Sequence, residues 1–225
     1  MPPHEEVMGA EEEYLKLLRR PDLPAEELER ILRDRDARRY HAVRLALAGH
    51  RTTPRGDALT LVETLFWRGL ARLSADPRVH PEVRRAADTQ LLRRLPELAL
   101  AERIDLARTT GRGTLSALRQ DPDPRVVAGF LDNRFTTEPD VVSVAAAARS
   151  RPETLVAIAE HPRWAPRRGV REALLRNPAL PPAAAEPLLA VAAERELLEL
   201  RDGLGGRPAL RAVAQRVLAR RARAD

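Results

Sequence analysis

The chain of 225 residues contains no cysteine. This absence excludes disulfides, zinc–thiolate sites, iron–sulfur clusters and a cysteine nucleophile. The five histidines are scattered, without HExxH spacing or a pair four residues apart, so we expect no metal ion and no cofactor. No serine, threonine or pair of carboxylates stands in a motif for nucleophilic or acid–base catalysis. We therefore predict that the protein is not an enzyme.

Long apolar runs are also missing. No stretch approaches 18 uninterrupted apolar residues, and the first 20 residues have neither the basic start nor the apolar centre of a signal peptide. We expect a cytoplasmic protein with no membrane contact. Aromatic residues make up only 3% of the chain, and leucine and alanine supply most of the 44% that is hydrophobic. Such a composition is typical of helical proteins.

Proline marks the starts of the expected helices. Because proline lacks an N–H, it suits the first turn of a helix and disrupts the interior. Eight of the 19 prolines stand before or at the beginning of segments with helical spacing: Pro24, Pro54, Pro81, Pro96, Pro124, Pro152, Pro181 and Pro208. No segment alternates with the period of a strand. The pattern predicts an all-α fold.

The most informative feature is an internal repeat. Residues 25–94 and 152–221 align without a gap, 127 positions apart, and 19 of 70 positions are identical, against about 7 expected by chance. We predict two equivalent helical blocks joined by a shorter middle block, 95–151, in one continuous domain, 1–225, with 1–9 disordered. The leucines expected to be buried are Leu47, Leu61, Leu70 and Leu91 in the first copy and Leu174, Leu188, Leu197 and Leu218 in the second.

A shorter element occurs three times, as VRLALAGHRTTP (43–54), VVAGFLDNRFTT (126–137) and VREALLRNPALP (170–181). Each copy is an amphipathic half-helix that ends at a polar residue, His50, Asn133 or Asn177. Because asparagine tolerates the left-handed conformation that closes many helices, we expect these three residues at helix C-caps.

The phrases LRQDPDPRVVAGFLDNRFTTEPDVV and LVAIAEHPRWAPRRGVREALLRNPALP resemble the leucine-rich-repeat-variant pattern, a relative of HEAT and armadillo repeats. The stretch LAERIDLAR (100–108) is similar to a group of uncharacterised bacterial proteins. The resemblance covers about 25–221 and implies a right-handed α-solenoid of stacked units that presents a concave face to a partner. The family's iron–sulfur cluster is excluded, and His50-Arg51 and Asn133-Arg134 depart from its usual Asn-Pro.

Arginine supplies almost all of the positive charge. The net charge is +6, and only Lys16 of the 39 basic residues is a lysine. Several arginines recur at equivalent positions of the two copies. They could line a groove for nucleic-acid phosphates or form ion pairs between repeats, and we favour the ion pairs. Trp67 and Trp164 suit core positions, with an exposed binding hot spot as the alternative. The candidate partner-binding residues are Arg84, Arg93, Arg94, Arg211, Arg220, Arg221, Trp67 and Trp164.

The function predicted from these features is that of a non-catalytic scaffold that binds another protein. Two alternatives stay open, a nucleic-acid-binding array and a regulatory subunit that docks an enzyme. Nothing in the sequence indicates an oligomeric state.

Overall fold

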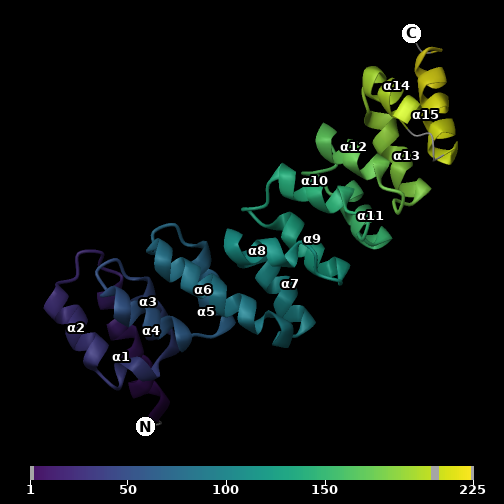
Figure 1. Ribbon diagram of the computed structural model, residues 1–225. Helices are drawn as coiled ribbons and strands as arrows, with labels where there is room; N and C mark the ends of the chain where they lie inside the picture. The colour runs from purple at the N-terminus through teal and green to yellow at the C-terminus, as the bar shows by residue number, and fades with distance from the viewer. Residues whose placement is uncertain (1–2, 204–207, 224–225) are drawn as a thin grey trace. The chain divides into compact units, whose positions relative to one another are not determined.

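The computed structural model describes residues 3–203 and 208–223. These residues form fifteen α-helices and two short 3₁₀ helices and no strand (Figure 1). The prediction of an all-α fold is confirmed. The chain divides into two compact units, Met1–Ala117 (unit 1) and Leu118–Asp225 (unit 2). None of the described helices is long and apolar enough to cross a membrane.

Unit 1 is built from short helices that pack on near neighbours in the chain. α3 contacts α1, α4 and α5, while α6 contacts α4 and α5, and α7 contacts α5. α1 begins at Pro3, within the stretch 1–9 for which we expected disorder. The elements are α1 (Pro3–Leu18), α2 (Ala25–Arg33), η1 (Ala37–Arg39), α3 (His41–Gly49), α4 (Arg55–Glu63), α5 (Trp67–Ala75), α6 (Pro81–Arg94), η2 (Leu95–Glu97), α7 (Leu100–Thr109) and α8 (Arg112–Leu118), whose last residue opens unit 2.

Unit 2 continues with helices of similar length. α11 packs against α9 and α13, α12 packs against α10 and α13, and α15 packs against α13 and α14. The helices are α9 (Pro124–Asp132), α10 (Glu138–Ala146), α11 (Pro152–Glu160), α12 (Arg168–Arg176), α13 (Pro182–Val191), α14 (Glu194–Gly203) and α15 (Pro208–Arg221).

Helix starts follow the prolines as expected. Pro24, Pro54 and Pro181 are N-caps, and Pro81, Pro124, Pro152 and Pro208 are the first residues of their helices. Pro96 lies in the 3₁₀ helix η2. At each of these positions the missing N–H costs no intrahelical hydrogen bond.

The two repeat blocks form the same succession of helices. α2 and α11, α3 and α12, and α6 and α15 begin and end 127 positions apart. α4 and α13, and α5 and α14, begin 127 positions apart, and the second-copy helix is one residue longer in each pair. The contacts of α6 with α4 and α5 recur as contacts of α15 with α13 and α14. Helix boundaries and packing therefore agree with the predicted duplication.

The expected core leucines are buried, with one exception. Seven of the eight are at most 4% exposed. Leu218 on α15 is only partly buried, although its counterpart Leu91 on α6 is fully buried. η2 follows α6 directly and packs on it, whereas no described helix follows α15. The burial predicted for Leu218 is therefore found only in part.

The three repeated C-cap residues are not left-handed. His50, Asn133 and Asn177 do occupy C-caps, but their φ angles are −73°, −65° and −73°, in the extended region. No residue in the described part of the chain has a positive φ. The expectation that asparagine closes these helices through a left-handed backbone was wrong.

These side chains act through hydrogen bonds instead. Asn177 accepts the N–H of Ala179 at 2.9 Å and donates its amide to the carbonyl of Ala147 at 3.0 Å. His50 lies 127 positions earlier in the chain, and its Nε2 is 3.0 Å from the carbonyl oxygen of Arg20. Arg20 and Ala147 are also 127 positions apart, so a histidine replaces an asparagine and keeps the same link to the preceding helix end. This contact is therefore equivalent in the two copies.

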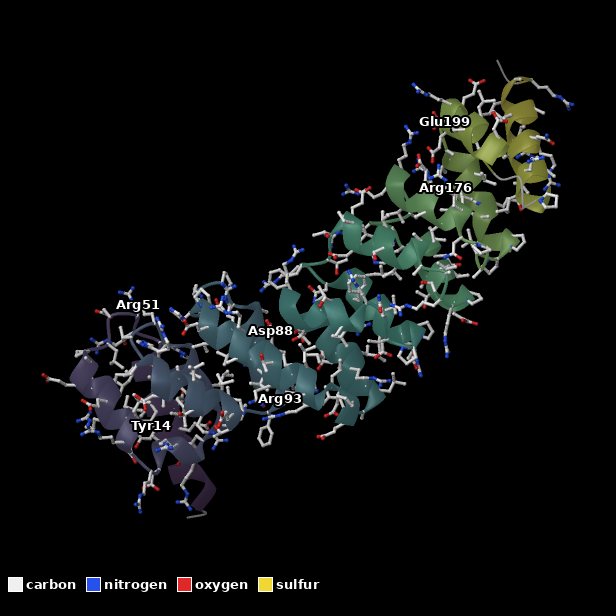
Figure 2. The ribbon with its side chains drawn as sticks, in the orientation of Figure 1. Tyr14, Arg51, Asp88, Arg93, Arg176 and Glu199 are labelled. Atoms are coloured by element: carbon white, nitrogen blue, oxygen red, sulfur yellow. The ribbon has the colours of Figure 1, made fainter. Side chains whose placement is uncertain are left out.

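Asp88 on α6 fixes the start of α8 within unit 1 (Figure 2). One of its oxygens accepts hydrogen bonds from the hydroxyl of Ser74 at 2.7 Å and from the N–H and hydroxyl of Thr114 at 3.1 and 2.7 Å. A Cβ on Gly113 would lie 2.2 Å from the other oxygen. A polar cluster thus joins the middle block to the first repeat block. A side chain at position 113 would force the carboxylate of Asp88 to move.

Candidate functional site

Arg94 and Arg221, two of the predicted partner-binding residues, are engaged inside their own units. Arg94 donates to the carbonyls of Leu65 and Glu63 at 2.6 and 3.1 Å. Arg221 makes the equivalent hydrogen bonds in the second copy, to the carbonyl oxygens of Ala192 at 2.7 Å and Ala190 at 2.6 Å. Both guanidinium groups satisfy carbonyls at the C-terminal end of a helix, which lack intrahelical partners.

The other four candidate arginines make no ion pair with the residues that the structure describes. Arg84 and Arg211 are half-buried, and the Nε of each is buried without a hydrogen-bond partner in that part of the chain. Arg93 and Arg220 are exposed. The ion pairs that we favoured are therefore not found at these four positions. Two other repeated arginines do form them, Arg171 with Glu196 at 2.6 Å and Arg68 with Asp105 at 3.3 Å.

The two tryptophans have different environments. Trp164 is 2% exposed and donates its indole N–H to the carbonyl of Leu131 at 2.9 Å, so it belongs to the core of unit 2. Trp67 is half-buried at the start of α5, and its indole N–H donates to Glu102 at 2.9 Å. Only Trp67 reaches the surface.

Trp67 lies in a groove of about 790 Å³ in unit 1, which we call the aromatic groove. α3, α5 and α7 contribute its walls. Its lining includes His41, Leu45, Phe66, Trp67, Gly69 and Arg72. Its volume falls within the range of ordinary ligand pockets. Phe66 is 66% exposed although it is a large apolar side chain.

His41 holds Phe66 in this exposed position. The two rings stack, with centroids 4.9 Å apart and planes 30° apart. The backbone N–H of Phe66 also donates to Nε2 of His41 at 3.1 Å. Since Nε2 must be unprotonated to accept this bond, His41 acts here as a neutral imidazole. The aromatic surface is preorganised before any partner arrives.

Gly69 keeps the groove open. A Cβ at this position would lie 3.1 Å from Cε1 of His41 and 3.6 Å from Cδ1 of Leu45. A larger side chain would push against the imidazole that supports Phe66. The role of glycine here is close approach, since its backbone φ is not positive.

The same positions in the second copy carry charges. Counterparts of the groove residues, 127 positions later, are Arg168, Glu172, Ala193, Glu194, Glu196 and Glu199. Arg168 pairs with Glu172 at 2.7 Å and with Glu199 at 2.8 Å. One copy of the repeat therefore presents an aromatic surface where the other presents ion pairs, so the fold itself does not require the aromatic residues.

Sequence reasoning singled out Trp67 but missed His41, Phe66 and Gly69. The gapless alignment of the copies held the signal, because His41 stands opposite Arg168 and Phe66 opposite Ala193. Identities between the copies report the shared core, whereas differences in polarity between them report the surface.

His41 makes the groove sensitive to pH. Burial, followed by repulsion from Arg44, lowers the pKa of His41 below its ordinary value, and Glu11 opposes this shift. Because the pKa of His41 is lower in the folded state than in the unfolded state, the unfolded chain takes up the proton first as the pH falls. The contribution of neutral His41 to the free energy of unfolding is therefore complete above about pH 6.5 and is lost below it. We expect the free energy of unfolding to fall more steeply from pH 7.5 to 5.5 in the wild type than in His41→Gln.

An NMR titration of the histidine Cε1–H resonances measures this pKa directly. The resonance that disappears in His41→Gln identifies the residue. A midpoint at or above pH 6.5 contradicts the burial of a neutral imidazole against Phe66.

No three His, Cys, Asp or Glu side chains in the described ranges lie together as metal ligands. Comparison of the chain with models of known protein families, with curated proteins and with solved structures gave no match. The candidate site therefore rests on the chain's own geometry and on the contrast between its two copies.

Proposed function

We propose that this protein is a non-catalytic helical-repeat scaffold that binds another protein through the aromatic groove of unit 1. The observation that carries the proposal is Phe66, which is 66% exposed and held by a stack and a hydrogen bond from His41. Phe66 and the half-buried Trp67 are adjacent, and contiguous exposed apolar surface marks interaction sites. Trp67 adds a second residue type common in binding hot spots.

The repeat architecture supports a scaffold role. Within each unit the helices pack on others one or two places away in the chain, as the units of HEAT-like arrays do. We propose on this basis, and on the sequence resemblance, that the short helical repeats are of the leucine-rich-repeat-variant or HEAT-like type and form a right-handed α-solenoid. A regulatory subunit is the special case in which the bound protein is an enzyme.

The variant that tests the groove is Phe66→Ala. A partner is first isolated with the wild-type protein from the organism that supplies the sequence, then purified and titrated by calorimetry. Because truncation of an aromatic hot spot typically costs at least 2 kcal/mol of binding free energy, we expect the affinity to fall by about 30-fold or more.

Val191→Ala is the matched control. Val191 is 68% exposed on α13 of unit 2 and does not line the groove, so its truncation should leave the affinity unchanged. Equal losses in the two variants, or no loss in Phe66→Ala, would show that the partner binds elsewhere.

Nucleic acid is the second candidate, and α15 is the observation that favours it. Arg216, Arg220 and Arg223 surround a shallow hollow of about 320 Å³, whose remaining lining residue is Ala219. If this surface binds nucleic-acid phosphates, replacing the three arginines with glutamine should weaken binding to duplex DNA and flatten its dependence on salt. Under the scaffold proposal the wild type binds DNA no more tightly than the non-specific range of about 10⁻⁶ to 10⁻⁴ M.

A further inference from the structure

A small pocket in unit 2, separate from the aromatic groove, gathers three arginine side chains. Its volume is about 200 Å³, and Arg119, Arg149 and Arg151 line it, from the stretch after α8 and the link between α10 and α11. Asp121 is the only carboxylate in its lining. One oxygen of Asp121 already accepts the N–H of Asp123 at 2.9 Å. Positive charge therefore dominates the pocket.

The three arginines are incompletely paired. Arg119 has a carboxylate oxygen of Asp140 at 3.8 Å, the outer limit of an ion pair, and its Nε is buried with no partner in the described residues. Arg149 donates to the neutral amide oxygen of Gln120. Arg151 is exposed and forms no ion pair within the described ranges. Because none of the three guanidinium groups has a close carboxylate partner in the described residues, an anion in the pocket would compensate their charge.

The first turn of α11 adds uncharged donors. Thr154, which is 5% exposed, lines the pocket from this turn. The N-cap residue Arg151 makes no side-chain capping bond to the helix. The first N–H groups of a helix lack intrahelical acceptors, and the helix dipole favours negative charge at this end. Arg151 and Thr154 therefore bring the N-terminal end of α11 to the pocket lining, while Pro152 supplies no N–H and Glu153 adds a negative charge to this turn.

The duplication shows that the repeat does not need these residues. The counterparts of Arg149 and Arg151 in the first copy are Asp22 and Pro24, and that of Thr154 is Glu27. α2 and α11 nevertheless have equivalent boundaries. Arg149 and Arg151, at the end of the middle block, are therefore not required for α11 to form.

We propose that this pocket binds a small tetrahedral oxyanion, either inorganic phosphate or the phosphoryl group of a small phosphate ester. Guanidinium donors match phosphate oxygens in geometry, and charge-assisted bonds of this kind are about twice as strong as neutral ones. The pocket is smaller than those that hold drug-sized ligands, about 300–1,000 Å³, and suits a group of a few atoms.

Calorimetric titration of the full chain with orthophosphate, at constant low ionic strength with chloride as the reference salt, tests the proposal. We expect one site per chain. Arg151→Gln should weaken it about tenfold, because one charge-assisted contact is lost. Arg176→Gln is the matched control, since Arg176 is an exposed arginine on α12 that does not line the pocket. Circular dichroism verifies that both variants remain folded.

Further titrations identify the source of the anion. Glycerol phosphate binding more tightly than orthophosphate indicates an ester ligand, and the reverse order indicates the free ion; both support the site. Acetate binding as tightly as phosphate, no phosphate binding below about 10 mM, or equal losses in Arg151→Gln and Arg176→Gln would overturn it. Binding restricted to oligonucleotides would also overturn it, because an extended phosphate backbone would then be the ligand.

Discussion

Glu196→Ala should lower the free energy of unfolding of unit 2 by about 3–5 kcal/mol, because it leaves a buried arginine without its carboxylate. Arg171 is 8% exposed and Glu196 is 3% exposed. The guanidinium of Arg171 donates two hydrogen bonds to the carboxylate of Glu196, from Nε to Oε1 at 3.0 Å and from Nη2 to Oε2 at 2.6 Å. Its third nitrogen donates to the carbonyl of Pro166 at 2.5 Å.

Two further variants separate the cost of an unpaired charge from the value of the pair. Replacement of both partners, as Arg171→Met with Glu196→Leu, should restore most of the lost stability, since apolar pairs often replace buried ion pairs at no net cost. Glu199→Ala removes an exposed carboxylate from the same helix and should cost less than about 1 kcal/mol. A loss below 1 kcal/mol in Glu196→Ala contradicts the buried pair.

The measurement can be confined to unit 2, because the chain has two tryptophans and each unit holds one of them. In a Trp67→Phe background, urea unfolding followed by fluorescence reports on Trp164 alone. The reciprocal Trp164→Phe chain reports on Trp67 in unit 1. Coincident transitions in the two backgrounds support the single continuous domain that the sequence predicts, and separated transitions support two independent ones.

Trp164→Ala should also be strongly destabilising, by about 3–5 kcal/mol, because it opens a cavity in the core of unit 2. The residue is 2% exposed, and the change also deletes the donor to the carbonyl of Leu131. Its counterpart in the first copy is Ala37, which is fully buried. Unit 1 is therefore packed around an alanine here, whereas unit 2 is packed around an indole.

Trp67→Ala is the comparison for this prediction. Trp67 is half-buried at the aromatic groove, so its loss should affect partner binding more than stability. Unfolding is followed by far-ultraviolet circular dichroism, since both variants lose a fluorophore. A smaller loss of stability in Trp164→Ala than in Trp67→Ala contradicts the assignment of core and surface.

The sequence predicted the helices well because their signals are local. Pro81 and Pro208 mark helix starts through backbone chemistry alone, and Leu47 and Leu174 repeat because the same core is built twice. Asn177 was placed at a C-cap correctly but for the wrong reason, since its amide reaches a carbonyl 30 residues away. Contacts over such separations do not follow from helical spacing.

The candidate sites were harder to predict. Arg94 looked like a surface cation, yet it satisfies two carbonyls about 30 residues earlier in the chain. His41 had no motif, and only its distance to Phe66 shows what it does. Arg119 and Arg151 become neighbours in one pocket only after the helices between them have folded.

The most direct test of the central claim is site-specific photo-crosslinking from the aromatic groove. A benzoyl-phenylalanine at position 66 should form a crosslink to one defined protein in living cells of the source organism. The additional change Gly69→Glu, which copies the residue of the second repeat, should abolish that crosslink by filling the groove. No crosslink from position 66, or the same crosslinks from position 191, would contradict a protein-binding function of this groove.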